Sequence, residues 1–212
     1  MVDYKKYSEF IDKKEKGSWF FQEVPLSMCD KKINVLCGVN GSGKSMSLRM
    51  FQEYFEKHNI KYLIYRGHID GVGERWANVL NNDRDSSYAQ GILSKLSSEG
   101  EERKMMFDLW QKKILLPQIN NIEYVLLDEV DSGLSPDRIW NSLGGLTQKV
   151  KETPHLKWII TANQYEMIEC LRSKDTKIIW IPTLEEWNPQ SYEEFKKPYY
   201  FYIQEIYKRG NS

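Results

Sequence analysis

Short apolar runs alternate with helical patterns along most of this chain, and that alternation constrains the fold more than any other feature. The apolar runs are INVLC at 33–37, YLIY at 62–65, YVLL at 124–127, WIIT at 158–161 and KIIWI at 177–181. The helical patterns cover 45–58, 99–113, 136–151 and 166–171. Short, nearly continuous apolar runs are typical of parallel strands covered by helices on both faces. The sequence therefore predicts an α/β domain with three layers and a largely parallel sheet.

Three segments depart from this alternation. Residues 68–97 are polar and contain several glycines, and we interpret 68–113 as a small helical subdomain inserted in the domain. The first 30 or so residues include WFF at 19–21, and we expect one or two antiparallel strands there. The tail YYFYIQEIY at 199–207 fits an edge strand or a helix.

A length of 212 residues suits a single domain that spans 1–212.

A glycine-rich segment, GVNGSGKS at 38–45, lies between the first predicted strand and the first predicted helix. It matches the phosphate-loop pattern G-x-x-x-x-G-K-[ST], in which glycines let backbone N–H groups approach an anion. We expect Lys44 to reach the β- and γ-phosphates of a nucleotide and Ser45 to hold Mg²⁺. The residues expected to bind the nucleotide here are Gly38, Asn40, Gly41, Ser42, Gly43, Lys44, Ser45 and Met46. The alternative is a glycine-rich turn that binds nothing.

A second candidate site follows the apolar run at 124–127, where the chain continues into Asp128 and Glu129. A carboxylate at the carboxyl end of a buried strand lies beside the phosphate loop of a parallel sheet. We expect Asp128 to bind Mg²⁺, directly or through water, and Glu129 to act as the general base that polarises the attacking water. The alternative is an acidic pair that caps a strand end, and the upstream phosphate loop favours the functional interpretation.

Beyond these two motifs, the sequence LSSEGE at 96–101 resembles the signature motif of the ATP-binding cassette (ABC) ATPases. Ser98 and Gly100 match the serine and second glycine of that motif, whereas Glu99 stands where a glycine is usual. The resemblance implies a phosphate-loop fold in which Ser98 and Gly100 bind the γ-phosphate of ATP held by another subunit. Ser98 with Glu101 also fits an ordinary capping box, and the two interpretations are compatible.

Other parts of the chain depart from the family pattern. Ser135 stands where the family's loop after the catalytic glutamate has an aspartate, and Ala162 stands at the place of the switch histidine. Asn163 or Gln164 could then contact the γ-phosphate in its stead. The resemblance also calls for an aromatic residue that stacks on adenine and a glutamine near the metal. The candidates are Trp19, Phe20 and Phe21 for the stacking residue and Gln90 for the glutamine.

The interval from Lys44 to Ser98 is short for the ABC family and contains no sustained heptad pattern. The chain therefore resembles the small soluble AAA/ABC-type ATPases of bacteria and phages, which are related to the RecF and SMC heads. This implies a head-to-tail homodimer that binds and hydrolyses ATP with Mg²⁺. It also implies a second protein partner and a role in DNA maintenance or phage defence. The alternatives are the ATP-binding subunit of a transporter with a separate membrane chain, and a non-hydrolysing adaptor.

The composition limits the partners and the compartment. Thirty basic residues balance thirty acidic ones, so no net field draws the chain to nucleic acid or to an anionic membrane. The tail at 195–209 interleaves aromatic and basic residues in a way that suits single-stranded DNA, although we favour tyrosines packed on the core. No apolar run is long enough to span a membrane. Three scattered cysteines and a polar N-terminus lead us to expect a cytoplasmic protein without an integral membrane segment.

Overall fold

The computed structural model describes residues 2–15, 23–67, 107 and 121–210. These residues form a six-stranded sheet in the order β2-β3-β4-β1-β5-β6. Its strands are β1 (Ile33–Cys37), β2 (Tyr62–Arg66), β3 (Tyr124–Asp128), β4 (Lys157–Ala162), β5 (Thr176–Trp180) and β6 (Glu185–Glu186). Neighbouring strands pair in parallel, except that β6 runs antiparallel to β5. The expected α/β class with a largely parallel sheet is thus confirmed.

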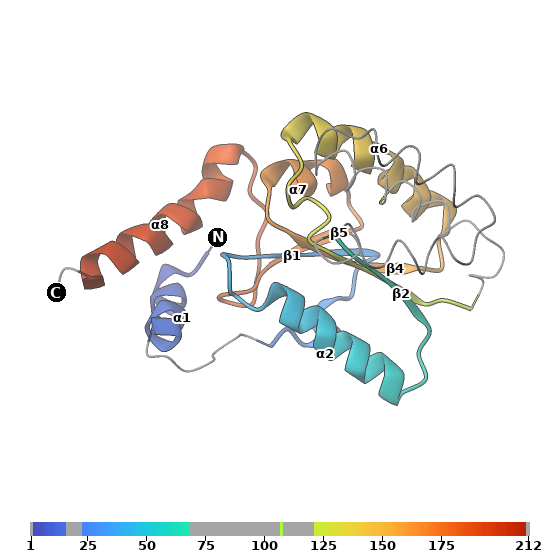
Figure 1. The fold of residues 1–212 in the computed structure, drawn as a ribbon, viewed down its shortest axis with the longest axis horizontal. Coiled ribbons are helices and arrows are strands. Elements are labelled where there is room, and N and C mark those ends of the chain that lie inside the picture. The colour runs from blue at the N-terminus through green and yellow to red at the C-terminus, as the bar shows by residue number, and fades with distance from the viewer. Residues whose placement is uncertain (1, 16–22, 68–106, 108–120, 211–212) are drawn as a thin grey trace, which may run out of the picture.

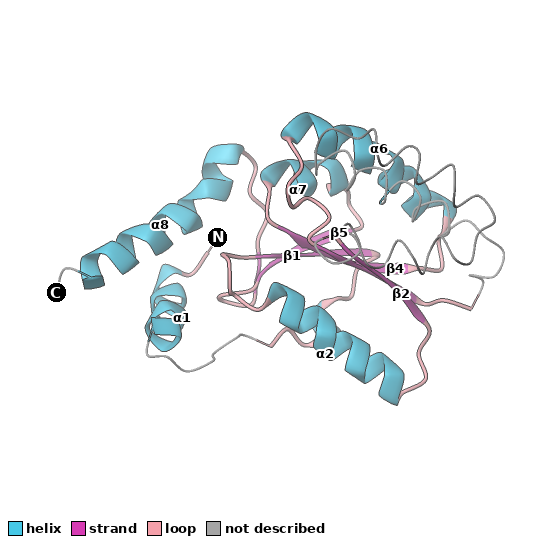
Figure 2. Ribbon diagram, in the orientation of Figure 1, coloured by secondary structure: helices cyan, strands magenta, loops and turns pink. Residues whose placement is uncertain are grey.

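Helices cover both faces of the sheet, as Figures 1 and 2 show. They are α1 (Tyr4–Glu15), α2 (Lys44–Lys57), α6 (Pro136–Glu152), α7 (Tyr165–Leu171) and α8 (Tyr192–Gly210), with a short 3₁₀ turn, η1, at Leu26–Met28. In the view of Figure 1, α2 lies below the sheet and α6 and α7 lie above it. Helices α1 and α8 come from opposite ends of the chain and lie together at one end of the molecule. No helix in the described ranges is long and apolar enough to cross a membrane.

Side chains of each strand alternate between two apolar clusters, one on each face of the sheet. In β1, Val35 belongs to the cluster under α6 and α7, whereas Leu36 belongs to the cluster around α2. In β4, Ile160 and Ile159 divide in the same way, and all four side chains are fully buried. Because both faces of β1, β3 and β4 are covered, these strands are buried along nearly their whole length, which explains why their sequences form nearly continuous apolar runs.

The expected antiparallel strands at the N-terminus are wrong for the described residues there. Tyr4–Glu15 forms helix α1, and the chain from 23 onward continues into a 3₁₀ turn. The helix forms because Tyr7, Phe10 and Ile11 are spaced at i, i+3 and i+4, so that all three are buried on one side. The aromatic cluster at 19–21, on which the expectation rested, lies outside the described residues.

The tail at 199–207, for which the sequence allowed an edge strand or a helix, is part of helix α8. Phe195 and Tyr199 lie one helical turn apart and contact each other. Tyr199 packs on Trp180, and Phe195 packs on Trp187, which in turn packs on Trp180. Tyr199 and Tyr202 thus pack on the core, as we favoured from the sequence, whereas Tyr200 and Tyr207 are exposed. The small helical subdomain expected at 68–113 lies outside the described residues, apart from Phe107, which is helical and packs on Tyr65.

The topology brings the functional candidates to one edge of the sheet. The carboxyl ends of β1, β3 and β4 all point the same way, because these strands are parallel. Strand β4 lies between β1 and β3, so one strand separates the glycine-rich loop from the acidic pair. From β1 the chain crosses to the far edge at β2, and from β4 it crosses past β1 to β5. Crevices at the carboxyl ends of strands, where connections diverge, are the usual ligand sites of such sheets.

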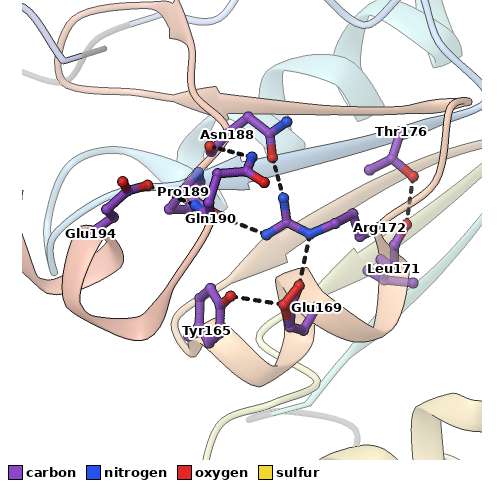
Figure 3. Close-up of polar contacts among 9 residues, drawn as sticks. All are labelled: Tyr165, Glu169, Leu171, Arg172, Thr176, Asn188, Pro189, Gln190 and Glu194. Carbon is purple, nitrogen blue, oxygen red and sulfur yellow. Dashed lines mark hydrogen bonds and ion pairs between the residues drawn. The ribbon is translucent and has the colours of Figure 1, made fainter.

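A polar network around Arg172 joins α7 to the start of α8 (Figure 3). The Arg172 guanidinium donates to Glu169 Oε1 at 2.7 Å, to Asn188 Oδ1 and to the Pro189 carbonyl. Glu169 is held from its other oxygen by the Tyr165 hydroxyl at 2.7 Å. The network fixes the segment between β6 and α8 to a helix that follows β4, so α8 begins at a defined place relative to the sheet edge.

Candidate functional site

The loop that follows β1 turns back sharply and leads directly into α2. Gly41 and Gly43 have φ angles of 73° and 100°, which only glycine adopts without strain. Gly38 is required for a different reason, since a Cβ at this position would lie 2.4 Å from the Ser42 hydroxyl oxygen. Ser42 is fully buried, and its hydroxyl finds no hydrogen-bond partner among the residues that the structure describes. The loop is therefore tightly curled, and it encloses a hydroxyl that has no hydrogen-bond partner in the described part of the chain.

Lys44 begins α2 and directs its side chain back into the loop. Its ammonium donates to the carbonyl oxygens of Gly38, at 2.8 Å, and of Val39, at 3.3 Å. Only 4 % of the residue is exposed, and burial lowers the pKa of the Lys44 amine. A buried cation whose bonds go to neutral carbonyls is costly, and an anion in the loop would offset that cost.

Ser45 and Asp128 meet, although 83 positions separate them in the sequence. The Ser45 hydroxyl donates to Asp128 Oδ1 at 3.0 Å, and the Thr161 hydroxyl donates to the same oxygen at 2.9 Å. Asp128 is almost wholly buried at the end of β3. Two hard oxygen donors, a hydroxyl and a carboxylate, thus lie beside the glycine-rich loop, which is a donor set that Mg²⁺ accepts.

The next residue, Glu129, occupies a strained turn. Its φ is 52°, a left-handed value that non-glycine residues rarely adopt. Its backbone N–H donates to the Thr161 hydroxyl oxygen at 2.8 Å. Gly67, at the end of β2, is required beside this turn, because a Cβ there would lie 2.3 Å from the Glu129 carbonyl oxygen. Such strain is stored where the surroundings hold a side chain in a particular position, so Glu129 is a functional candidate on its geometry as well as on its sequence.

A second buried carboxylate, Asp131, organises the loops after β3 and β4. Its Oδ2 accepts the backbone N–H groups of Asn163 and Gln164 at 2.7 and 2.8 Å. The Gln164 side-chain amide donates to the carbonyls of Asp131 and Leu134 at 2.7 and 3.0 Å. Burial raises the pKa of the Asp131 carboxyl to about 6, against the effect of the two N–H donors. The amide N–H₂ of Gln164, one of two expected γ-phosphate contacts, is therefore engaged with the loop that follows Glu129.

The structure brings together most of the residues expected at the site. Lys44, Ser45, Asp128 and Glu129 converge at the carboxyl edge of the sheet, and the loop from Gly38 to Gly43 lies next to them. Met46 is 38 % exposed on the first turn of α2. Three residues depart from the ABC pattern, and Glu99 lies outside the described ranges. Of the other two, Ala162 is buried at the end of β4 and Ser135 is exposed where α6 begins.

The other expected site residues lie outside the described ranges. They are Ser98 and Gly100 of the signature-like motif, the aromatic candidates Trp19, Phe20 and Phe21, and Gln90. Their expected roles stay predictions.

Sequence reasoning missed several residues that the structure places at this edge. Thr161 bridges Asp128 and the Glu129 backbone, and Asp131 joins the loops after β3 and β4. Two residues from the chain ends also reach the glycine-rich loop. The Lys14 ammonium donates to the Asn40 carbonyl at 2.7 Å, and the Tyr199 hydroxyl lies 3.5 Å from the Gly38 carbonyl. No local sequence signal marks Lys14 or Tyr199, because their position depends on how α1 and α8 pack.

In the part of the chain that is described, no group of three or more His, Cys, Asp or Glu side chains is placed to hold a metal ion. A magnesium ion that is shared with nucleotide phosphates and water needs only one or two protein oxygens, so Ser45 and Asp128 suffice for that kind of site. Comparison of the chain with protein-family models and with curated proteins finds no match.

Proposed function

We propose that this protein binds ATP with Mg²⁺ and hydrolyses it slowly, as a compact ATPase switch of the ABC type. The observation that carries the proposal is the 3.0 Å contact between the Ser45 hydroxyl and Asp128. It places the two oxygen donors expected to share a magnesium ion together, beside a glycine-rich loop that contains a buried lysine. A loop with nothing to bind would have no reason to bury that charge against neutral carbonyls.

In the proposed reaction, backbone N–H groups of the loop from Gly41 to Lys44 bind the phosphates, aided by the N-terminus of α2. The Lys44 ammonium moves from the carbonyls of Gly38 and Val39 to phosphate oxygens, where the charge-assisted bonds are stronger. Ser45 and Asp128 would hold the magnesium ion, which supplies charge neutralisation on the phosphates. Glu129 accepts a proton from the attacking water as general base, the water oxygen bonds to the γ-phosphorus, and the bond from that phosphorus to the bridging oxygen breaks, which releases ADP and phosphate.

The backbone around Glu129 supports this role. Thr161 accepts the Glu129 N–H and donates to Asp128, so one hydroxyl fixes the positions of the proposed base and of the metal ligand relative to each other. Positioning of this kind is what a general base needs, since its effect depends on distance and direction to the water. The side chain at 162 is an alanine and supplies no polar group, which fits slow turnover.

The head-to-tail dimer is part of the proposal and rests on the ABC resemblance. In it, Ser98 and Gly100 of one copy close over the nucleotide of the other copy, and the closed dimer acts on a partner protein or on DNA. The neutral overall charge gives no support to DNA over protein as the target.

Nucleotide binding and hydrolysis test the proposal directly. We expect the wild type to bind ATP·Mg²⁺ in calorimetry, and Lys44→Ala to lose binding up to about 1 mM nucleotide. Glu129→Gln should keep binding and lose phosphate release about 100-fold or more. Lys57→Ala is the matched control, because Lys57 is an exposed lysine at the other end of α2. A wild type that binds no nucleotide overturns the proposal.

Two further outcomes separate the alternatives. If the wild type binds ATP but releases phosphate no faster than Glu129→Gln, the protein is a non-hydrolysing adaptor. The dimer is tested by light scattering of Glu129→Gln with ATP and Mg²⁺. We expect a dimer there and a monomer when Ser98→Arg is added. A monomer in every condition contradicts the homodimer and leaves nucleotide binding standing.

A further inference from the structure

A second lysine lies against the glycine-rich loop, on the outside and from a different part of the chain. Lys14 is near the end of α1, and its ammonium donates to the Asn40 carbonyl at 2.7 Å. A Cβ on Gly41 would come within 3.1 Å of the same nitrogen. The ammonium therefore lies over the apex of the loop, whereas the Lys44 ammonium lies on the inner carbonyls of Gly38 and Val39.

The partners of Lys14 leave its charge uncompensated. Besides Asn40, the ammonium donates to the Tyr202 hydroxyl at 2.9 Å and lies 5.0 Å from the centre of the Tyr202 ring. Across the described ranges, no carboxylate pairs with it. A carbonyl, a hydroxyl and a ring face are weak substitutes for an anion. A half-buried cation with such partners is well suited to receive a phosphate oxygen.

The position of Lys14 is set by packing between the two ends of the chain. Helix α1 is held on α8 by an ion pair between Asp12 and Arg209 at 2.6 Å, and by contact of the Tyr4 and Phe201 rings. These contacts fix the helix, and the flexible four-carbon stem of Lys14 allows its ammonium to exchange the Tyr202 hydroxyl for another acceptor.

We propose that Lys14 is a second cation for the nucleotide and binds the terminal phosphate from the outer side of the loop. This inference rests on the proposed function, since it requires that a triphosphate occupies the loop. Lys44 and the loop amides approach the β- and γ-phosphates from the inner side of the loop, so Lys14 adds a second cation to the terminal phosphate from the other side. Lys14 then distinguishes ATP from ADP, and its exchange of Tyr202 for phosphate links the nucleotide to the packing of α1 on α8.

The test is to measure the affinity of the full-length protein for ATP and for ADP, each with Mg²⁺, by calorimetry. We expect Lys14→Met to weaken ATP binding about tenfold and to change ADP binding less than about threefold. Lys14→Arg keeps the charge and should restore most of the ATP affinity. Lys5→Met is the matched control, because Lys5 is exposed on the same helix, and its affinities should equal those of the wild type.

A variant that disturbs folding is distinguished by Lys14→Gln. This side chain is polar, carries an N–H donor and has no charge, so it should show the same selective loss of ATP affinity. Equal affinity of wild type and Lys14→Gln for ATP overturns the inference, and so does an equal loss for ATP and ADP. In both cases the wild type still binds ATP, so the proposed function stands. A wild type that binds neither nucleotide refutes the proposed function itself.

Discussion

Lys44 carries a charge that the fold buries, and no carboxylate among the described residues forms an ion pair with it. Its bonds go to two backbone carbonyls, and burial lowers the pKa of its amine. Methionine has a similar length and no charge, so Lys44→Met should remove the cost of desolvating the ammonium. We expect the ligand-free variant to gain about 1 to 2 kcal/mol in free energy of unfolding, measured by urea denaturation.

The same substitution in the exposed Lys57, at the end of α2, is the control and should change stability by less than about 0.5 kcal/mol. A destabilised Lys44→Met would mean that the two carbonyl bonds outweigh the desolvation of the charge. That result would contradict the argument that burying the Lys44 charge costs free energy, which a bound anion would offset.

Asp131 gives the protein a pH dependence of stability with a definite sign. Its pKa in the folded chain, about 6, lies above the ordinary aspartate value of 3.8, chiefly because the carboxyl is buried. The folded chain therefore holds this proton more tightly than the unfolded chain does. The stabilising contribution of the carboxyl is complete below pH about 4 and is lost as the pH rises through about 6, so that little of it remains above pH about 7.

We expect that contribution to be of the order of 1 to 3 kcal/mol. In Asp131→Asn, the free energy of unfolding should lack the fall seen in the wild type between pH 4 and 7. Asp175→Asn, at an exposed aspartate, should retain it. Identical pH profiles for the wild type and Asp131→Asn would show that the buried carboxyl is ionised at no cost.

At the scale of elements, Arg172 connects two helices through one guanidinium. It donates to Glu169 of α7 and to Asn188 and Pro189 in the segment that leads into α8. Arg172→Ala leaves these acceptors without their charged donor, and we expect a loss of about 1 to 3 kcal/mol in free energy of unfolding. Amide hydrogen exchange in the first turn of α8 should quicken at the same time.

Lys174→Ala, at an exposed lysine two positions further on, should change neither quantity. If Arg172→Ala lowered stability but left exchange in α8 unaltered, the network would support α7 alone.

Strands β1 to β5 could be predicted from the sequence because each contains a short apolar run, whereas β6, which is only Glu185–Glu186, contains none and was not predicted. Every residue of β1 is buried, for example, and so is every residue of β4 after Lys157. Helix α1 was harder to recognise, since only Tyr7, Phe10 and Ile11 repeat at helical spacing within a polar stretch. The many Tyr and Phe residues of α8 have a high propensity for strands, and the packing of Tyr199 on the core outweighs that propensity.

The candidate site divides in the same way. The glycine-rich segment at 38–45 and the acidic pair Asp128–Glu129 are each continuous in the sequence, so local patterns could mark both as candidates. Thr161 and Asp131 could not, because their roles depend on strand order and register, which no local pattern specifies. Lys14 reaches the loop only through the packing of α1 on α8, a contact between residues near opposite ends of the chain.

At the scale of the whole molecule, α1 and α8 close the fold by packing on each other and on the edge of the sheet. Tyr7 lies at the centre of this contact, fully buried against Trp180, Phe201 and Tyr202. Its neighbourhood also contains Lys14, which contacts both Tyr202 and the glycine-rich loop. The stability of this contact and the geometry of the candidate site are therefore linked.

The Tyr7 hydroxyl is buried without a hydrogen-bond partner among the described residues. Burial raises the pKa of Tyr7, so the hydroxyl keeps its proton, and the unpaired group costs free energy. Tyr7→Phe removes that group with little change of shape and should stabilise the protein by about 1 kcal/mol, measured by urea denaturation. Tyr7→Ala should cost about 3 to 5 kcal/mol, because it leaves a cavity between α1, α8 and the sheet.

The two Tyr7 variants together separate packing from polarity. If Tyr7→Phe also weakened ATP binding, the hydroxyl would have a role at the loop beyond packing. If Tyr7→Ala were as stable as the wild type, α1 would contribute nothing to the fold, and Lys14 would have no fixed position from which to reach a phosphate.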